Sequence, residues 1–81
     1  MTNIREETAK LLKDEYQIEP DVTALLFERG ILHEPDCRNV LMRDEYKKKA
    51  QPKERQRLRG EIAERFCVSV KLVEKVVLPN L

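Results

Sequence analysis

Residues 60–78 read GEIAERFCVSVKLVEKVVL, and this segment has the residues that two helices joined by a tight turn require. A helix, a three-residue turn and a second helix at a steep angle need a small residue where the backbones approach, and Ala63 meets that need. Ser69 is a good N-cap for the second helix. The apolar contacts between the helices are expected from Ile62, Phe66, Val68, Val73 and Val76.

The segment 62–77, IAERFCVSVKLVEKVV, closely resembles the helix-turn-helix of bacterial and phage repressors, sigma-type factors and transposase or Mor-type activator domains. The form typical of those proteins is similar to LAerlgVSrstVsrIl, which the segment follows position by position. The upstream run CRNVLMRDEYKKKAQ also looks like the preceding helix of small Mor-like or homeodomain-like proteins. The resemblance covers about a fifth of the chain and is specific for this structural unit.

The resemblance implies that residues 69–78 form a recognition helix lying in the major groove of double-stranded DNA. Lys71 and Lys75 would then contact guanine edges or phosphate. Ser69 would contact a phosphate, and Val70 a thymine methyl group. By position, the groove-facing side chains would be Ser69, Val70, Lys71, Glu74, Lys75 and Leu78.

Three features depart from the helix-turn-helix pattern. Cys67 stands where a turn glycine is common, so the backbone there either avoids left-handed geometry or bears some strain. Val70 and Leu72 are apolar where many DNA readers are polar. Glu74 would face phosphates or accept a hydrogen bond from a cytosine amine. These departures weaken base readout rather than the fold.

The net charge of the 81-residue chain is only +1, which by itself argues against a nucleic-acid binder. The charge is nevertheless divided, because residues 1–36 hold four basic and nine acidic residues, a net charge of −5. Residues 37–81 hold twelve basic and six acidic residues, a net charge of +6. Such asymmetry favours a polyanion-binding surface, although a solvated charged face with a favourable intramolecular dipole is the alternative.

The basic residues concentrate just before the helix-turn-helix. Seven bases and a single acid, Glu54, lie between residues 47 and 59. In helix-turn-helix domains the helix before the reader crosses the DNA backbone, so these bases are expected beside phosphates. The predicted phosphate contacts are Lys47, Lys48, Lys49, Lys53, Arg55, Arg57 and Arg59.

Helical periodicity appears throughout the chain, and it predicts an all-α fold: a compact bundle of about five short helices ending in the helix-turn-helix. The first helix is expected to begin at a capping box of Asn3 and Glu6 and to end near Tyr16. The second should begin at Pro20 and end before Gly30. The predicted apolar faces are Ile4, Thr8, Leu11, Leu12 and Tyr16 in the first helix, and Val22, Leu25 and Leu26 in the second.

The third helix is expected to open at Pro35 and to break at Gln51–Pro52, where a fourth helix starts. Gly60 lies inside the fourth helix, where it either weakens the helix or admits a close neighbour. The fifth helix should end before Pro79. The apolar face of the third helix is predicted as Cys37, Val40 and Leu41 with Tyr46 at the far end, and that of the fourth as Leu58, Ile62 and Phe66.

The length predicts a single domain made of two parts. Residues 1–34 would form an acidic helical hairpin that supports the reader or binds a partner, and residues 35–81 a basic three-helix unit. Cys37 and Cys67 form no CxxC pair and His33 is the single histidine, so we expect no metal site and no cofactor. Two reduced thiols, no signal peptide and no membrane span favour the cytoplasm.

Two functions therefore compete, and an enzyme is the least favoured class because the chain has no nucleotide-binding or metalloprotease motif. The first is sequence-specific DNA binding by a small bacterial or phage transcriptional regulator, acting as a homodimer because one such unit buries little surface. The alternative is an interaction adaptor that reuses the helix-turn-helix fold. Its acidic half would bind a protein partner through Leu25, Leu26, Phe27, Ile31 and Leu32.

Overall fold

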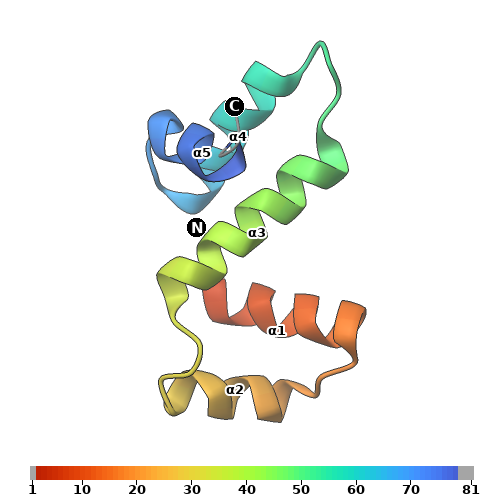
Figure 1. Cartoon of the computed structure of the whole chain (residues 1–81), viewed down its shortest axis with the longest axis vertical. Helices are drawn as coiled ribbons and strands as arrows, with labels where there is room; N and C mark the ends of the chain where they lie inside the picture. The colour runs from red at the N-terminus through yellow and green to blue at the C-terminus, as the bar shows by residue number, and fades with distance from the viewer. Residues whose placement is uncertain (1, 79–81) are drawn as a thin grey trace. The chain divides into compact units, whose positions relative to one another are not determined.

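The computed structural model describes residues 2–78, which contain five α-helices and no β-strand (Figure 1). The all-α fold expected from the periodicity is confirmed. The helices are α1 (Ile4–Tyr16), α2 (Pro20–Glu28), α3 (Glu34–Lys49), α4 (Arg55–Phe66) and α5 (Val70–Val77). None of these helices is both long and apolar enough to cross a membrane.

The chain divides into two compact units, residues 2–38 and residues 39–78, and the division falls inside α3. The first unit contains α1, α2 and the start of α3. The second contains the rest of α3 together with α4 and α5. The boundary lies four residues beyond the predicted division into residues 1–34 and 35–81.

In unit 2–38, α1 and α2 pack side by side as a hairpin (Figure 1). The Asn3 side chain caps α1 as predicted, because its Oδ1 accepts a hydrogen bond from the Glu6 N–H at 3.1 Å. The helix ends at Tyr16 as expected, and Gln17 closes it in the left-handed conformation with φ 57°. Gly30 follows α2 with φ 76°, which explains why a glycine stands there.

The predicted apolar face of α2 is wrong for Val22 and Leu25, whereas its third residue, Leu26, is half-buried. Val22 and Leu25 are each 46% exposed, and the buried residues of α2 are Thr23 and Phe27. The α2 sequence has apolar side chains on both sides, so its periodicity does not determine which side packs against α1. Tyr16, expected on the apolar stripe of α1, is likewise exposed at the end of its helix.

The side of α2 that faces α1 contains an unusual buried hydroxyl. Thr23 is almost fully buried, and its Oγ1 has no hydrogen-bond partner among the described residues. On the same unit the Arg5 guanidinium lies over the Phe27 ring, 5.1 Å from the ring centroid. Arg5 Nε also lies 3.3 Å from Glu34 Oε2, an exposed ion pair.

In unit 39–78, α4 and α5 pack together, and most of the buried side chains come from these two helices. The predicted face of α3 needs correction: Val40 is 47% exposed, while Met42, which the prediction omitted, is fully buried. Leu41, Met42 and the half-buried Tyr46 form the inward side instead, with Met42 and Tyr46 one turn apart. The core of this unit is Leu41, Met42, Leu58, Ile62, Ala63, Phe66, Val73 and Val76.

The break between α3 and α4 includes Pro52 as predicted, but residues 52–54 form a turn, so α4 begins at Arg55 and not at Pro52 as expected. A Cβ atom added at Gly60 would meet nothing within 4 Å, so this glycine admits no close neighbour. The last helix ends at Val77. The predicted stop at Pro79 lies outside the described residues.

Candidate nucleic-acid interface

The turn between α4 and α5 consists of residues 67–69. Cys67 closes α4 in the left-handed conformation, with φ 57° and ψ 45°. The Val68 N–H then donates to the Ala63 carbonyl oxygen at 2.9 Å, and this hydrogen bond to a residue five positions earlier is typical of a Schellman motif. Of the two alternatives for Cys67, the structure shows the strained one, because a side chain occupies a backbone geometry that favours glycine.

Both ends of α5 are held by side chains. Ser69 Oγ accepts a hydrogen bond from the Leu72 N–H at 3.1 Å, so the predicted N-cap is confirmed. At the other end, Arg43 Nε of α3 donates to the Val76 carbonyl oxygen at 3.1 Å. A helix of eight residues is marginal by itself, and these caps together with the buried Val73 and Val76 stabilise it.

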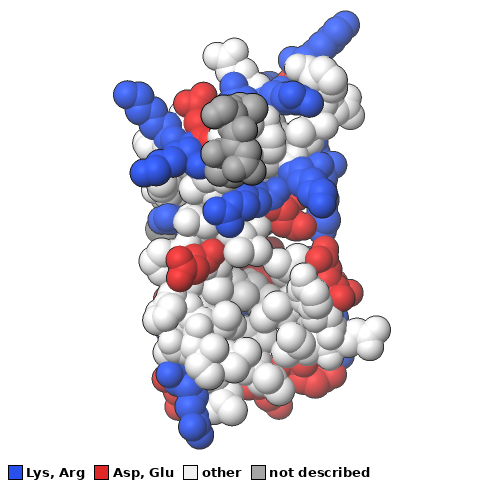
Figure 2. Space-filling view, in the orientation of Figure 1, with Lys and Arg blue, Asp and Glu red and all other residues white. Residues whose placement is uncertain are grey.

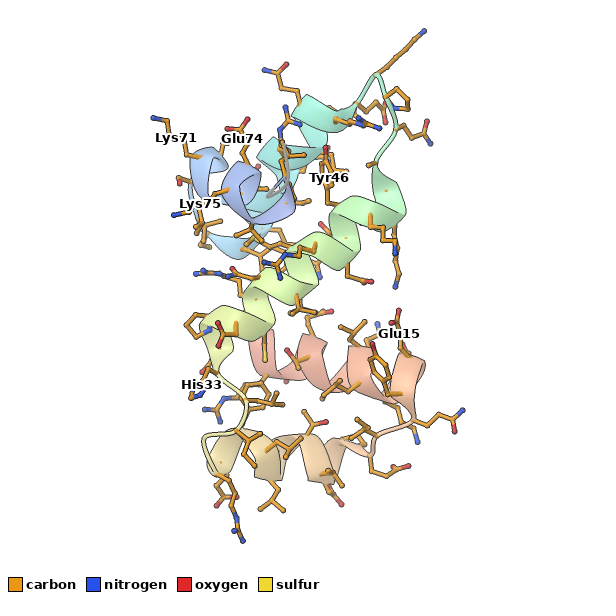
Figure 3. All side chains as sticks on the ribbon, in the orientation of Figure 1. Glu15, His33, Tyr46, Lys71, Glu74 and Lys75 are labelled. Atoms are coloured by element: carbon orange, nitrogen blue, oxygen red, sulfur yellow. The ribbon has the colours of Figure 1, made fainter. Side chains whose placement is uncertain are left out.

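The outward side of α5 carries two cations. Lys71 and Lys75 are exposed and one helical turn apart, and both project away from α4 (Figure 3). Among residues 2–78, neither lysine forms an ion pair. Ser69 and Val70 are exposed at the start of the same helix, whereas Leu78, directly after it, is half-buried.

Glu74 points toward α4, whereas the two lysines of α5 project away from it (Figure 3). Its Oε2 is 3.5 Å from Nε of Arg59, and this Nε is buried and makes no hydrogen bond. Arg59 Nη1 donates a long hydrogen bond of 3.4 Å to the Tyr46 hydroxyl. The Arg59 side chain is only 17% exposed, so it joins α3, α4 and α5 inside the unit.

The remaining predicted phosphate ligands fall into two groups. Lys48 pairs with Asp44 at 3.1 Å, and Arg57 lies between Glu54 and Glu61 at 3.2 and 3.6 Å. Lys49 is more loosely placed, 3.9 Å from Glu45. The second group is exposed and forms no ion pair with any described residue: Lys47, Lys53 and Arg55.

The surface of unit 39–78 is basic overall. Residues 39–78 contain eleven basic and six acidic residues, a net charge of +5. Figure 2 shows Lys and Arg side chains outnumbering acids on the visible side of this unit. In this unit, the Lys and Arg side chains with no ion pair or hydrogen bond to another described residue come from the end of α3, the following turn, the start of α4 and the outward side of α5.

The contacts of three residues in this region were not predicted from the sequence. Arg43 caps α5, Tyr46 contacts Arg59, and Arg65 pairs with Glu45 across α3 and α4. The sequence carries no local signal for these contacts, because each joins two different helices through residues at least 13 positions apart. The resemblance to a helix-turn-helix and the basic run between residues 47 and 59 pointed to this part of the molecule.

The cysteines differ in their surroundings. Both are free thiols; Cys37 is buried and Cys67 is exposed. Burial raises the pKa of the Cys37 thiol. Among residues 2–78, no group of three His, Cys, Asp or Glu side chains is arranged to hold a metal ion.

Comparison with known protein families, characterised proteins and solved structures finds no match for this chain. The fold alone places the chain among small all-α proteins. Any assignment of function has to come from the arrangement of its own residues.

Proposed function

We propose that the protein binds double-stranded DNA sequence-specifically, as a small prokaryotic or phage transcriptional regulator in the cytoplasm. The single observation that carries the proposal is the outward side of α5, where Lys71 and Lys75 lie one turn apart on a helix held at both ends. The amines of two lysines one turn apart can reach guanine edges or phosphates along one major groove.

In this proposal, α4 lies across the DNA backbone and α5 enters the major groove, as in helix-turn-helix domains. Val70 and Ser69 accompany the lysines at the start of α5, where recognition helices contact bases. Glu74 contributes to the position of α5 rather than to base reading, because it is paired with Arg59.

The phosphate contacts are assigned to the bases that have no carboxylate partner among the described residues, Lys47, Lys53 and Arg55. A base that already pairs with a carboxylate neutralises phosphate less effectively, so fewer counterions leave the DNA when it binds. Each neutralised phosphate contributes about 0.9 to the slope of log affinity against log salt concentration, so three contacts give a slope of about −3.

One unit of this size covers a single half-site, so we propose that specific binding requires two copies. This part of the proposal rests on the small area that one recognition helix buries. Sedimentation on a duplex containing two selected half-sites would distinguish one bound copy from two.

The decisive experiment is a fluorescence anisotropy titration with labelled duplexes, first of random sequence and then enriched by selection. Lys71→Ala/Lys75→Ala should weaken binding to the selected duplex by at least tenfold, since each base contact contributes about 1–3 kcal/mol. The matched control is Lys10→Ala/Lys13→Ala, which removes the same charge from unit 2–38. Absence of binding at low salt, or equal losses in the two double variants, would contradict the proposal.

A further inference from the structure

Unit 2–38 leaves one side of α2 uncovered. Val22 and Leu25 are each 46% exposed, and Ile31, in the turn that follows α2, is 64% exposed. Val22 and Leu25 are three residues apart, so they share one side of the helix, and Thr23 and Phe27 occupy the side that is buried. Two large aliphatic side chains on one side of a nine-residue helix give it an apolar patch without a partner in its own unit.

The border of this patch is acidic. Asp21 and Glu28 are exposed, lie within one turn of Leu25 and form no ion pair with any residue of 2–78. Unit 2–38 contains five basic and nine acidic residues, so its net charge is −4. Arg5 and Lys13 are already paired with carboxylates inside the unit. Arg29 is the one base within four residues of Leu25, so the patch combines aliphatic contact with a border of two acids and one base, net negative.

The charges disfavour a second copy of the same face as the occupant. In a two-fold antiparallel pair of α2 helices centred between Ala24 and Leu25, Asp21 of one copy would lie opposite Glu28 of the other. Such a dimer would also bring together two copies of unit 2–38, each with a net charge of −4. Like charges across an interface oppose association, whereas a basic surface would be attracted.

We propose that this side of α2 docks a basic amphipathic helix of another protein. Apolar residues of the partner cover Val22 and Leu25, and its lysine or arginine side chains pair with Asp21 and Glu28. The acidic border accelerates and orients the encounter, and the aliphatic contact retains the partner. This activity is independent of DNA binding and uses a different unit of the chain.

The test uses the full chain and three labelled synthetic peptides, each about 16 residues long so that a helix can form. One has leucines on one side and lysines around them, the second has glutamates in place of the lysines, and the third has serines in place of the leucines. Only the first should bind, and it should shift the methyl NMR signals of Val22, Leu25 and Ile31.

Variants of the patch make the test specific. Leu25→Ser and Glu28→Gln should each weaken binding of the basic peptide, Leu25→Ser by about tenfold. Val40→Ser is the matched control, because Val40 is an equally exposed aliphatic residue, at 47%, in the other unit. An unchanged circular dichroism melt shows that each variant still folds. If Leu25→Ser does not fold, the binding measured with Glu28→Gln still tests the proposal.

Three outcomes would overturn the proposal: equal binding of the acidic peptide, equal losses in Val40→Ser and Leu25→Ser, or no peptide binding. Self-association that Leu25→Ser abolishes, without peptide binding, would show that a second copy covers the patch. Because the patch lies outside α5, Lys71→Ala/Lys75→Ala should leave peptide binding intact, so either proposal can fail alone.

Discussion

Arg59 of α4 and Glu74 of α5 form an ion pair, with 3.5 Å between Nε and Oε2, that links the two helices. The arginine is largely buried, and its other contact is the Tyr46 hydroxyl on α3. One guanidinium therefore contacts all three helices of unit 39–78. The relationship explains how an acidic residue can stand on a helix proposed to approach DNA.

Glu74→Gln should lower the free energy of unfolding by about 0.5–1 kcal/mol, since it removes a partly exposed charge pair. It should leave the base preference of the selected duplex unchanged, because Glu74 is held by Arg59. Chemical denaturation and a repeat of the duplex selection measure the two effects. Glu61→Gln, which loses only an exposed contact with Arg57, is the control, and a shifted base preference in Glu74→Gln would place this carboxylate in the groove.

Cys67→Gly should stabilise the protein by about 0.5–1 kcal/mol, because it relieves a side chain in left-handed geometry. Cys67→Ala retains the Cβ and should change stability little. Gln17→Gly should also stabilise the protein, because Gln17 ends α1 with the same φ of 57°. Urea unfolding of the three variants tests the prediction, and a gain in Cys67→Ala equal to that in Cys67→Gly would attribute the effect to loss of the thiol.

The two glycines should respond in opposite directions to alanine. Gly60→Ala should raise the free energy of unfolding by about 0.5–1 kcal/mol, because the added Cβ meets nothing within 4 Å and the helix interior favours alanine. Gly30→Ala should lower it by about 1 kcal/mol, because φ is 76° there. Thermal denaturation of both variants is the measurement, and a destabilised Gly60→Ala would reveal a neighbour of α4 absent from residues 2–78.

Thr23→Val should raise the free energy of unfolding by about 1 kcal/mol, since the buried Thr23 hydroxyl makes no hydrogen bond within the described chain. Valine retains the shape of threonine without the unpaired polar group. Thr23→Ser is the matched control, because it keeps the hydroxyl and loses the methyl group, and it should destabilise. A loss of stability in Thr23→Val would mean that the hydroxyl has a partner in solution.

A thiol reagent should modify Cys67 at least about tenfold faster than Cys37 at neutral pH. Cys37 is buried, and burial raises the pKa of its thiol above the ordinary value, so little of the reactive thiolate is present. Its rate should rise as the pH increases toward that raised pKa. Mass spectrometry of timed alkylation gives both rates, and Cys67→Ser should retain only the slow phase; a fast phase in that variant would contradict the burial of Cys37.

The sequence predicted the helices and their ends well because those signals are local. The Asn3 and Ser69 caps each contact an N–H three residues away, and Gly30 and Pro52 constrain the backbone at their own positions. The buried side of α2 could not be predicted in this way. Val22 and Leu25 are as apolar as a core position requires, and only the packing of α1 determines that Thr23 and Phe27 lie inside.

In the candidate site, too, the features set by local spacing could be predicted from the sequence, and those set by contacts between helices could not. The outward placement of Lys71 and Lys75 follows from their spacing relative to Val73 and Val76, which the sequence shows. The pairing of Arg59 with Glu74 does not, because it depends on how two helices cross. Counting bases therefore overstates the number that can meet phosphates, since a count does not show which bases already face a carboxylate.

The residues that keep α5 in place are different from those that it shows to solvent. Val73, Val76, the Ser69 cap and the Arg43 contact hold the helix, whereas positions 70, 71 and 75 make no contribution to the core. Substitutions at these three positions are therefore nearly neutral for folding. Under the proposed function, the DNA target of this helix can change through successive single mutations while the architecture is inherited intact.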